Sequence, residues 1–309
     1  MTSMRIGLVA LGSHPDQVIA QAQRAEADGF ATLWFTGAIP GDPFVAMTLA
    51  ARATSSIEVG TAVQQTYAAH PLLQAARALG AAEAIGAPER FTLGVGPSHR
   101  PAIEGRLGLS YDTPGRHTDE YVQILTALLR GEQVNFAGQE FRVNAGPLPV
   151  PDGLEVQVLV AALGPRLLRV AGQYTAGTIP WMANARAIEN HIAPLIRKAA
   201  AEAGRPAPRI AAGLPVAVHD DVAEARAAAA EQFANYGLLP NYQRILAHGG
   251  VSGPAEAVIV GDEASVTRQI EALFEAGATD VWLPPFPVGP DRSASRARTR
   301  ALLKELARG

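Results

Sequence analysis

The sequence ADGFATLW at residues 27–34 shows the pattern from which the fold can be predicted. A helical segment ends at Gly29, a short turn follows, and an apolar run leads to Trp34, as expected for a helix followed by a buried strand. The sequence EAGATDVW at residues 275–282 repeats this pattern near the other end of the chain. Any helix-to-strand connection has this form, so the repeat alone does not identify the fold. The segments between the two copies decide it.

Strand-like and helix-like segments alternate along the whole chain. Eight apolar runs are predicted to be buried strands: residues 5–10, 31–36, 57–63, 90–95, 155–161, 175–180, 209–218 and 280–283. Helices are predicted at residues 14–28, 43–54, 71–85, 115–129, 165–172, 185–203, 222–236, 264–276 and 293–307. Continuous apolar strands are typical of a parallel sheet covered on both faces, and eight strand–helix units favour a closed barrel over an open sheet. The predicted fold class is α/β, a (β/α)8 TIM barrel.

The chain is predicted to form one domain over residues 1–309. Its 309 residues would suggest two domains by length alone, but a barrel of this kind is a single domain of comparable size. Insertions are expected at about 98–115, 131–150 and 237–262. Within the second, short alternating runs at 133–136 and 140–143 predict a β-hairpin, and the proline-rich residues 147–151 predict a rigid connector.

The composition excludes several classes of function. The net charge is −3 and basic residues concentrate only at 292–300, so we expect no nucleic-acid partner. The absence of cysteine excludes disulfides, thiolate nucleophiles and Cys-ligated metal centres, and the seven histidines have no HxxxH or HxH spacing, so no metal site is expected. We find neither a signal-peptide pattern nor an apolar stretch of 18 residues, so we expect a cytoplasmic protein that does not contact a membrane.

In a barrel of this type, ligands bind on the loops that follow the strands. The segment Gly94-Val95-Gly96-Pro97-Ser98-His99 follows the fourth strand, and its glycines would let a flat ligand approach the backbone. His99 is therefore a candidate site residue, and Trp181, beyond the sixth strand, is a candidate to stack on a ring. Carboxylates are scarce at the predicted strand ends, which suggests that a bound cofactor supplies the reactive centre. The GxGxxG, Walker and GxSxG motifs are missing, and the two lysines, at 198 and 304, fall in helices, so Schiff-base chemistry has no candidate.

Four segments together resemble the luciferase-like family of flavin and deazaflavin oxidoreductases, especially its coenzyme F420-dependent branch. They are residues 25–34, residues 57–63 with His70-Pro71, residues 90–96, and residues 158–166. Residues 277–280 are similar to the eighth unit of that family. The resemblance covers nearly the whole chain and implies a barrel with insertions.

The resemblance also implies a cofactor site. It implies a bulge with a non-prolyl cis peptide at Ala62-Val63 behind the cofactor ring, glycines 94 and 96 beside it, and a helix N-terminus near 161–165 facing its phosphate. The implied cofactor-binding residues are Thr36, Gly37, Thr61, Ala62, Val63, Gly94, Gly96, Pro97, Ala161, Ala162, Leu163, Gly164, Pro165 and Trp181. The cofactor would be coenzyme F420, with FMN as the alternative.

Two positions depart from the family pattern. Members that oxidise alcohols carry an Asp-His or similar pair where this chain has Gly37-Ala38, so the base for alcohol oxidation is missing. A glutamate found beyond the fourth strand of deazaflavin members is matched by His99. We predict that His99 is the proton donor, with a pKa in the neutral range.

These observations favour a reductase that moves a hydride from C5 of reduced coenzyme F420 to an activated C=C, C=N or C=O bond of a small organic molecule. One alternative is an FMN-dependent monooxygenase that uses reduced flavin and O2. Another is a protein that binds the cofactor without turnover. The expected partners are the small-molecule substrate and a second copy of the chain, because related barrels form dimers and the alanine-rich helices offer apolar surface.

Overall fold

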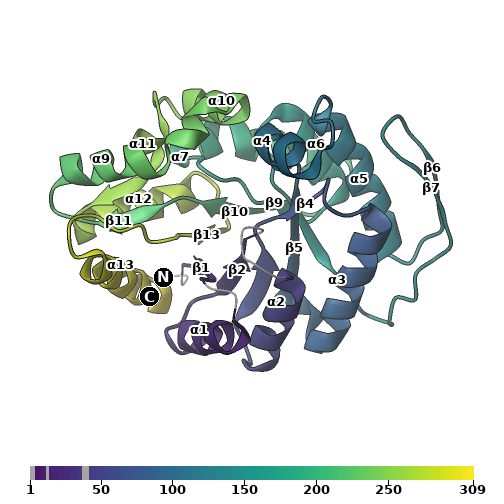
Figure 1. Cartoon of the computed structure of the whole chain (residues 1–309), viewed down its shortest axis with the longest axis horizontal. Helices are drawn as coiled ribbons and strands as arrows, with labels where there is room; N and C mark the ends of the chain where they lie inside the picture. Colours follow the sequence, from purple (N-terminus) through teal and green to yellow (C-terminus); the bar gives the residue numbers. More distant parts are fainter. Residues whose placement is uncertain (1–3, 12–13, 37–41) are drawn as a thin grey trace.

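Eight parallel strands close into a barrel in the computed structural model, which describes residues 4–11, 14–36 and 42–309 (Figure 1). The sheet order is β3-β2-β1-β13-β10-β9-β8-β5, and pairing of β3 with β5 closes the ring. Its strands are β1 (Ile6–Val9), β2 (Thr32–Phe35), β3 (Glu58–Thr61) with its continuation β4 (Gln64–Gln65), β5 (Phe91–Gly96), β8 (Gln157–Val160), β9 (Gly177–Thr178), β10 (Arg209–Gly213) and β13 (Asp280–Trp282). The predicted (β/α)8 barrel is confirmed.

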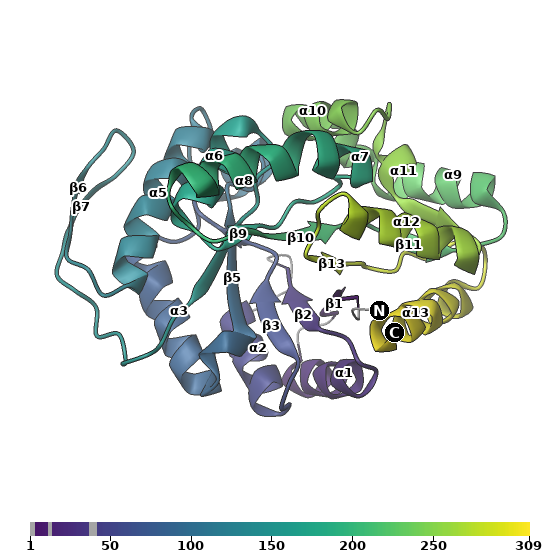
Figure 2. The same cartoon turned by 180° about the vertical axis from the view of Figure 1, so that it is seen from behind.

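Helices surround the barrel and cover the outer faces of its strands, as both front and rear views show (Figures 1 and 2). The longer ones are α1 (Pro15–Ala27), α2 (Pro43–Arg52), α3 (Pro71–Ile85), α5 (Pro114–Leu129), α6 (Pro165–Tyr174), α8 (Ala193–Glu202), α9 (Val222–Gln232), α10 (Pro240–His248), α12 (Glu263–Glu275) and α13 (Arg292–Arg308). The short ones are α4 (Arg100–Ala102), α7 (Ala185–Ala187) and α11 (Pro254–Ala257). Among the described residues, none of these helices has both the length and the apolar character that crossing a membrane would require.

Large aromatic side chains fill the inside of the barrel. Trp34 and Trp282 pack there with Leu159, Ile179 and Ala211, separate from the larger core between strands and helices. Three strand glycines make room for the two indoles, because a Cβ at Gly7 or Gly60 would meet Trp34 and one at Gly213 would meet Trp282, all closer than 3.0 Å. The tryptophans predicted within strands are thus core residues of the barrel interior.

The third strand of the barrel is interrupted between β3 and β4. The peptide bond between Ala62 and Val63 is cis, as the sequence resemblance implied. After this interruption, Gln64 and Gln65 pair with the end of β5. The chain therefore reaches further along β5 than β3 alone would and places Ala62 and Val63 at the rim of the barrel.

The predicted strand at residues 209–218 is wrong as a single strand. Only β10 belongs to the barrel, and β11 (Val216–Val218) pairs instead with β12 (Ile259–Gly261) in a separate two-stranded parallel sheet. Pro215 lies between β10 and β11, and proline has no N–H to continue the ladder. The strand β12 was not predicted, because its three residues lie within the expected insertion at 237–262.

The other insertions agree more closely with expectation. The predicted hairpin is confirmed as β6 (Val134–Ala137) paired antiparallel with β7 (Arg142–Ala145), and it projects from the edge of the molecule (Figure 1). The irregular stretch after β5 contains α4 and a π-helical turn at Ile103–Leu107. The helix predicted at 222–236 ends at Gln232, and a 3-10 turn at Ala234–Leu238 follows it.

Candidate functional site

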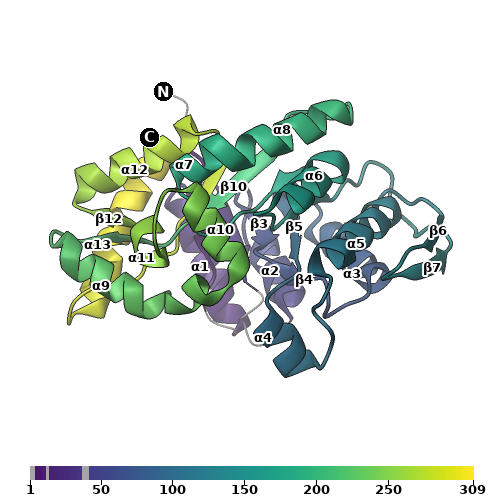
Figure 3. The same cartoon turned by 90° about the horizontal axis from the view of Figure 1, so that it is seen from above.

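A cleft of about 1360 Å³ opens at the carboxyl ends of the barrel strands. Its floor is made by residues at or just after the strand ends, including Ala62, Gly96 and Ala161, together with Trp181 and Trp282, which pack against the side chains inside the barrel. Two elements outside the barrel, α4 and α10, lie at this same end and form its walls (Figure 3). The cleft is thus where the predicted fold places a ligand site.

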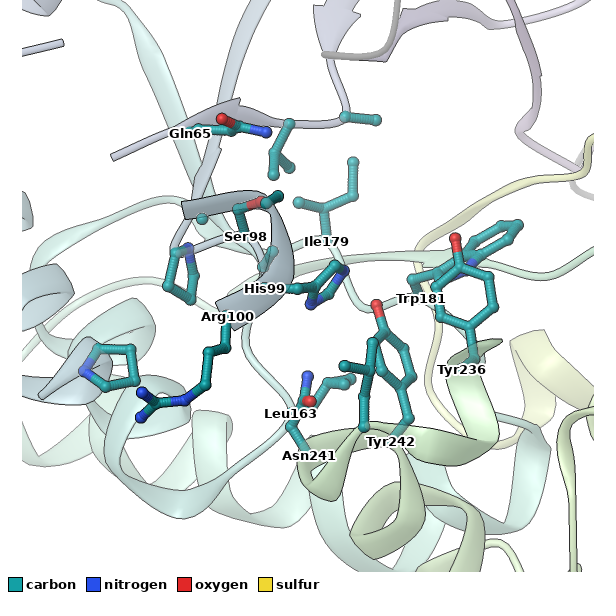
Figure 4. A pocket seen from close by; sticks show the side chains of 18 of the residues that line it. Gln65, Ser98, His99, Arg100, Leu163, Ile179, Trp181, Tyr236, Asn241 and Tyr242 are labelled. Carbon is teal, nitrogen blue, oxygen red and sulfur yellow. The ribbon is translucent and has the colours of Figure 1, made fainter. Parts of the chain in front are cut away.

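The loop that carries His99 is held in a defined conformation. Ser98 has a φ of 62°, which is unusual for a residue other than glycine. The Tyr111 hydroxyl donates a hydrogen bond of 2.6 Å to the Ser98 carbonyl and so holds this turn in place. Directed by the turn, the His99 side chain lines the cleft beside Tyr236 and Tyr242, with ring centroids 6.5 and 5.6 Å away (Figure 4).

Burial lowers the pKa of His99 below its ordinary value of 6.5. The shift is downward because the charged imidazolium loses hydration in this partly closed position. Around neutral pH the ring is mostly uncharged. Its protonated form, where present, is a stronger acid than an exposed histidine.

The structure brings most of the predicted site residues to the same cleft. Those that line the cleft are Thr36, Ala62, Val63, Gly96, Pro97, His99, Ala161, Leu163, Gly164, Pro165 and Trp181. Thr61, Gly94 and Ala162 do not line it, because all three are buried behind the wall. Gly37 lies outside the described residues.

Gly94 has a different role from the one predicted for it. A Cβ at this position would come within 2.0 Å of the Thr61 carbonyl oxygen, so the glycine allows β3 and β5 to approach closely rather than admitting a ligand. The Thr61 hydroxyl accepts a hydrogen bond from the Gly94 N–H and donates one to its carbonyl. Gly96 does line the cleft, and a Cβ there would meet Ala161 at 2.8 Å and Val63 at 3.0 Å.

The N-terminus of α6 faces the cleft without a side-chain cap. Its N-cap residue is Gly164, which has no side chain to accept a hydrogen bond, and Pro165 follows at the first helical position. The free backbone N–H groups of the first turn and the positive end of the helix dipole favour an anion at such a place. This geometry suits the phosphate group that the sequence resemblance implied for residues 161–165.

Arginines dominate the charge of the cleft. Arg100, Arg106, Arg166 and Arg244 line it, whereas Asp112 is the single acidic residue among the described lining residues. Arg100 is paired with Glu104 and Asp112, and Arg166 with Asp119. For Arg106 and Arg244 the structure shows no ion pair or side-chain hydrogen bond to any described residue, so both guanidinium groups are available to an anionic ligand.

Sequence reasoning missed one wall of the site. The chain from Phe233 to Arg244 contributes Tyr236, Leu238, Leu239, Asn241 and Tyr242 to the cleft. The sequence pattern predicts part of this segment as helix and part as an insertion. The clustered aromatic residues are the one sequence signal that could have drawn attention to this segment.

Among the described residues, no group of three or more His, Asp or Glu side chains is arranged to hold a metal ion. The lining is instead mostly apolar and aromatic, with His99 as its one imidazole. Such a cleft can bind a large planar molecule and exclude water from it, but it offers few acid–base groups of its own.

Comparison with known proteins gives a consistent result. Residues 3–280 match the family model for luciferase-like monooxygenases. The chain is 30% identical over 290 residues to the F420-dependent hydroxymycolic acid dehydrogenase of Mycobacterium tuberculosis, covering 85% of this chain and 77% of that protein. It is 26% identical over 304 residues to the 5,10-methylenetetrahydromethanopterin reductase of Methanolobus tindarius, covering 97% and 91%.

Solved structures show the same fold with two different cofactors. An F420-dependent secondary alcohol dehydrogenase, in complex with an F420-acetone adduct, superposes with a TM-score of 0.77 at 21% identity and covers 99% of this chain and 98% of its own. The oxygenating constituent of 3,6-diketocamphane monooxygenase from Pseudomonas putida, in complex with FMN, gives a TM-score of 0.71 at 18% identity, covering 99% and 97%. At these identities the likeness concerns the fold alone.

Proposed function

This chain belongs to the luciferase-like monooxygenase family, and from that premise we propose that it is a coenzyme F420-dependent reductase. The proposed substrate is a small organic molecule with an activated C=C, C=N or C=O bond. A relative whose name specifies F420 dependence, at 30% identity, supports the choice of cofactor. FMN with O2 is the competing assignment, since the same fold also carries FMN.

The observation that carries this proposal is the arginine-rich cleft. FMN ends in a single phosphate, whereas coenzyme F420 continues from its phosphate into a tail that bears several carboxylates. The uncapped α6 N-terminus accommodates one anionic group in either case. The unpaired Arg106 and Arg244 would have no anionic partner on FMN, but they match the further carboxylates of the F420 tail.

The cleft fits the planar part of the coenzyme as well. Ala62, Val63, Gly96 and Ala161 form an apolar floor, and the missing side chain at Gly96 and the small one at Ala161 leave room above it. When bound, the reduced coenzyme supplies a hydride from its C5 carbon, and the substrate gains two electrons as the coenzyme becomes oxidised.

The protein's own contribution is to orient the substrate, exclude water and supply a proton. His99 lines the cleft and makes no side-chain hydrogen bond to another described residue, so its ring is free to contact the substrate. We assign it the delivery of a proton to the substrate atom that does not receive the hydride. The apolar floor protects the reacting atoms from water.

Reversing the charge of Arg106 and of Arg244, the rim arginines of the cleft, tests the choice of cofactor. Arg106→Glu and Arg244→Glu should each raise the Kd for coenzyme F420 about three- to ten-fold at low ionic strength, with much less effect in 1 M salt, because exposed charges are screened. The Kd for FMN should change less, since only its phosphate carries charge. Isothermal titration calorimetry measures both.

Arg142→Glu provides the control, because Arg142 is an exposed arginine on the β6–β7 hairpin, outside the cleft. If the rim variants bind coenzyme F420 as well as the Arg142 variant does, the arginines do not hold the tail and the main support for this cofactor is lost.

A further inference from the structure

We propose that Tyr236, Tyr242, His99 and Trp181 form a hydrogen-bond-donating subsite for the carbonyl oxygen of an uncharged, ring-bearing substrate. The proposal deepens the proposed function, on which it rests, by naming a substrate class for the same cleft. It assigns Tyr236 and Tyr242 to substrate recognition, whereas the α6 N-terminus and the exposed Arg106 and Arg244 are left to the cofactor tail.

The four side chains come from separate elements and converge on one region. Tyr236 lies on the 3-10 turn after α9, Tyr242 on α10, His99 before α4, and Trp181 after β9. The Tyr236 and Tyr242 rings meet edge to face, with their centroids 4.8 Å apart. The ring centroids of Tyr236 and Trp181 are 6.1 Å apart. In Figure 4 the hydroxyl end of Tyr242 points toward the His99 ring, and that of Tyr236 lies beside Trp181.

These polar groups leave hydrogen-bonding capacity unused within the described part of the protein. The buried Trp181 indole N–H has the Tyr236 hydroxyl as its neighbour, and this contact opposes the effect of burial on the Tyr236 pKa. The Tyr236 hydroxyl donates no hydrogen bond to a described side chain, and the Tyr242 hydroxyl and the His99 ring make no side-chain hydrogen bond to any described residue. Polar groups in a mostly apolar cleft are normally paired, because leaving them unpaired costs free energy.

All four groups can donate a hydrogen bond, so the matching ligand group is an acceptor. Asp112, the one carboxylate among the described lining residues, is held by Ser110 and Arg100 instead. Figure 4 shows the Arg100 side chain extending away from His99 and the two tyrosines. Among the described lining residues, no unpaired carboxylate is therefore available to accept from these donors.

The charge state of the subsite favours a neutral acceptor. Burial raises the pKa of Tyr242 and of Tyr236, so both hydroxyls keep their protons throughout the usual pH range. Burial also lowers the pKa of His99, so the imidazole is mostly neutral near pH 7. An anionic group would lose its hydration here without meeting a charged group among these four donors, whereas a carbonyl oxygen would gain hydrogen bonds at a smaller cost.

The surroundings of the donors favour a ring-bearing substrate. Trp181 stacks on Trp282 with ring centroids 4.7 Å apart and an angle of 22°, which presents a flat aromatic surface. Phe286 and Leu239 add apolar area to the same cleft. Flat apolar walls with a few placed donors are typical of sites for cyclic or aromatic ketones and enones.

A pair of nearly isosteric ligands tests the subsite. 2-Acetylnaphthalene carries the carbonyl oxygen, and 2-isopropenylnaphthalene replaces it with a methylene group. Tyr242→Phe and Tyr236→Phe should each weaken binding of the ketone about three- to ten-fold while leaving the affinity for the alkene within two-fold, because each removes a single donor. Calorimetry on the protein with and without oxidised coenzyme F420 measures all affinities.

Tyr174→Phe is the matched control, because Tyr174 lies on α6 but lines a separate pocket away from the cleft. The subsite is refuted if the wild-type protein does not bind the ketone, or if both cleft variants weaken ketone and alkene equally or no more than the control. Should Tyr242→Phe fail to fold, the more exposed Tyr236 decides the outcome alone. Selective loss of ketone binding in a protein that does not bind coenzyme F420 would support the subsite and contradict the proposed cofactor.

Discussion

His99→Ala should lower kcat for the reduction of cyclohex-2-en-1-one by reduced coenzyme F420 about 10²- to 10⁴-fold, which is the usual contribution of a placed proton donor. The Kd for the coenzyme should stay within about three-fold, because the ring lies on the substrate side of the cleft beside Tyr236 and Tyr242. Steady-state kinetics and calorimetry measure the two quantities. Unchanged turnover with intact cofactor binding would remove His99 from the chemistry and favour a protein that only carries the cofactor.

The pH profile separates a proton donor from a merely structural histidine. Burial lowers the pKa of His99 below 6.5, so the protonated donor disappears as the pH rises through that lowered value. The value of kcat/KM should therefore fall with rising pH, with a midpoint below pH 6.5. His99→Gln should abolish this limb, and His14→Gln, an exposed histidine outside the cleft, should preserve it.

Arg209→Met should lower the free energy of unfolding by about 3–5 kcal/mol, the cost of leaving a buried carboxylate without its partner. Arg209 makes hydrogen bonds of 3.0 and 2.7 Å to Asp280, which is 2% exposed, and one of 3.1 Å to Glu58. It also donates to the Thr92 hydroxyl at 3.2 Å. Through these hydrogen bonds, Arg209 connects strands β3, β5, β10 and β13 at the end of the barrel opposite the cleft.

The comparison for this prediction is Arg298→Met. Arg298 also pairs with two carboxylates, Glu263 and Asp220, but its side chain is 37% exposed, so its loss should cost about 1 kcal/mol or less. Urea unfolding followed by circular dichroism measures both variants. If both variants lose the same small amount of unfolding free energy, the Arg209 network does not hold the barrel together.

The barrel could be predicted because its signal is local. Each apolar strand, each helix with one apolar face and each glycine at a helix end lies within a short window of sequence, and the count of eight units then favours closure. The Arg209 network carries no such signal, because Arg209 is 151 residues from Glu58 and 117 from Thr92, and only barrel closure brings them together. The split at Pro215 was missed because apolar residues continue on both sides of it.

The site was predicted as far as it depends on strand ends. Positions 62, 63, 96, 99 and 161 lie at the last residue of a strand or within three residues after it, and the barrel places them in the cleft. Gly94 was misassigned because a glycine needed for strand packing looks the same in sequence as one that admits a ligand. Tyr236 and Tyr242 were missed because residues 233–248 belong to no barrel unit, so their place over the cleft follows from tertiary packing alone.

Titration of the purified protein with coenzyme F420 and with FMN, at the same ionic strength, tests the central assignment most directly. The arginine-lined cleft predicts that coenzyme F420 binds with a Kd at least about ten-fold lower than that of FMN, a preference that weakens with added salt. Tight binding of FMN without measurable binding of coenzyme F420 would contradict the assignment and favour the oxygen-using chemistry instead.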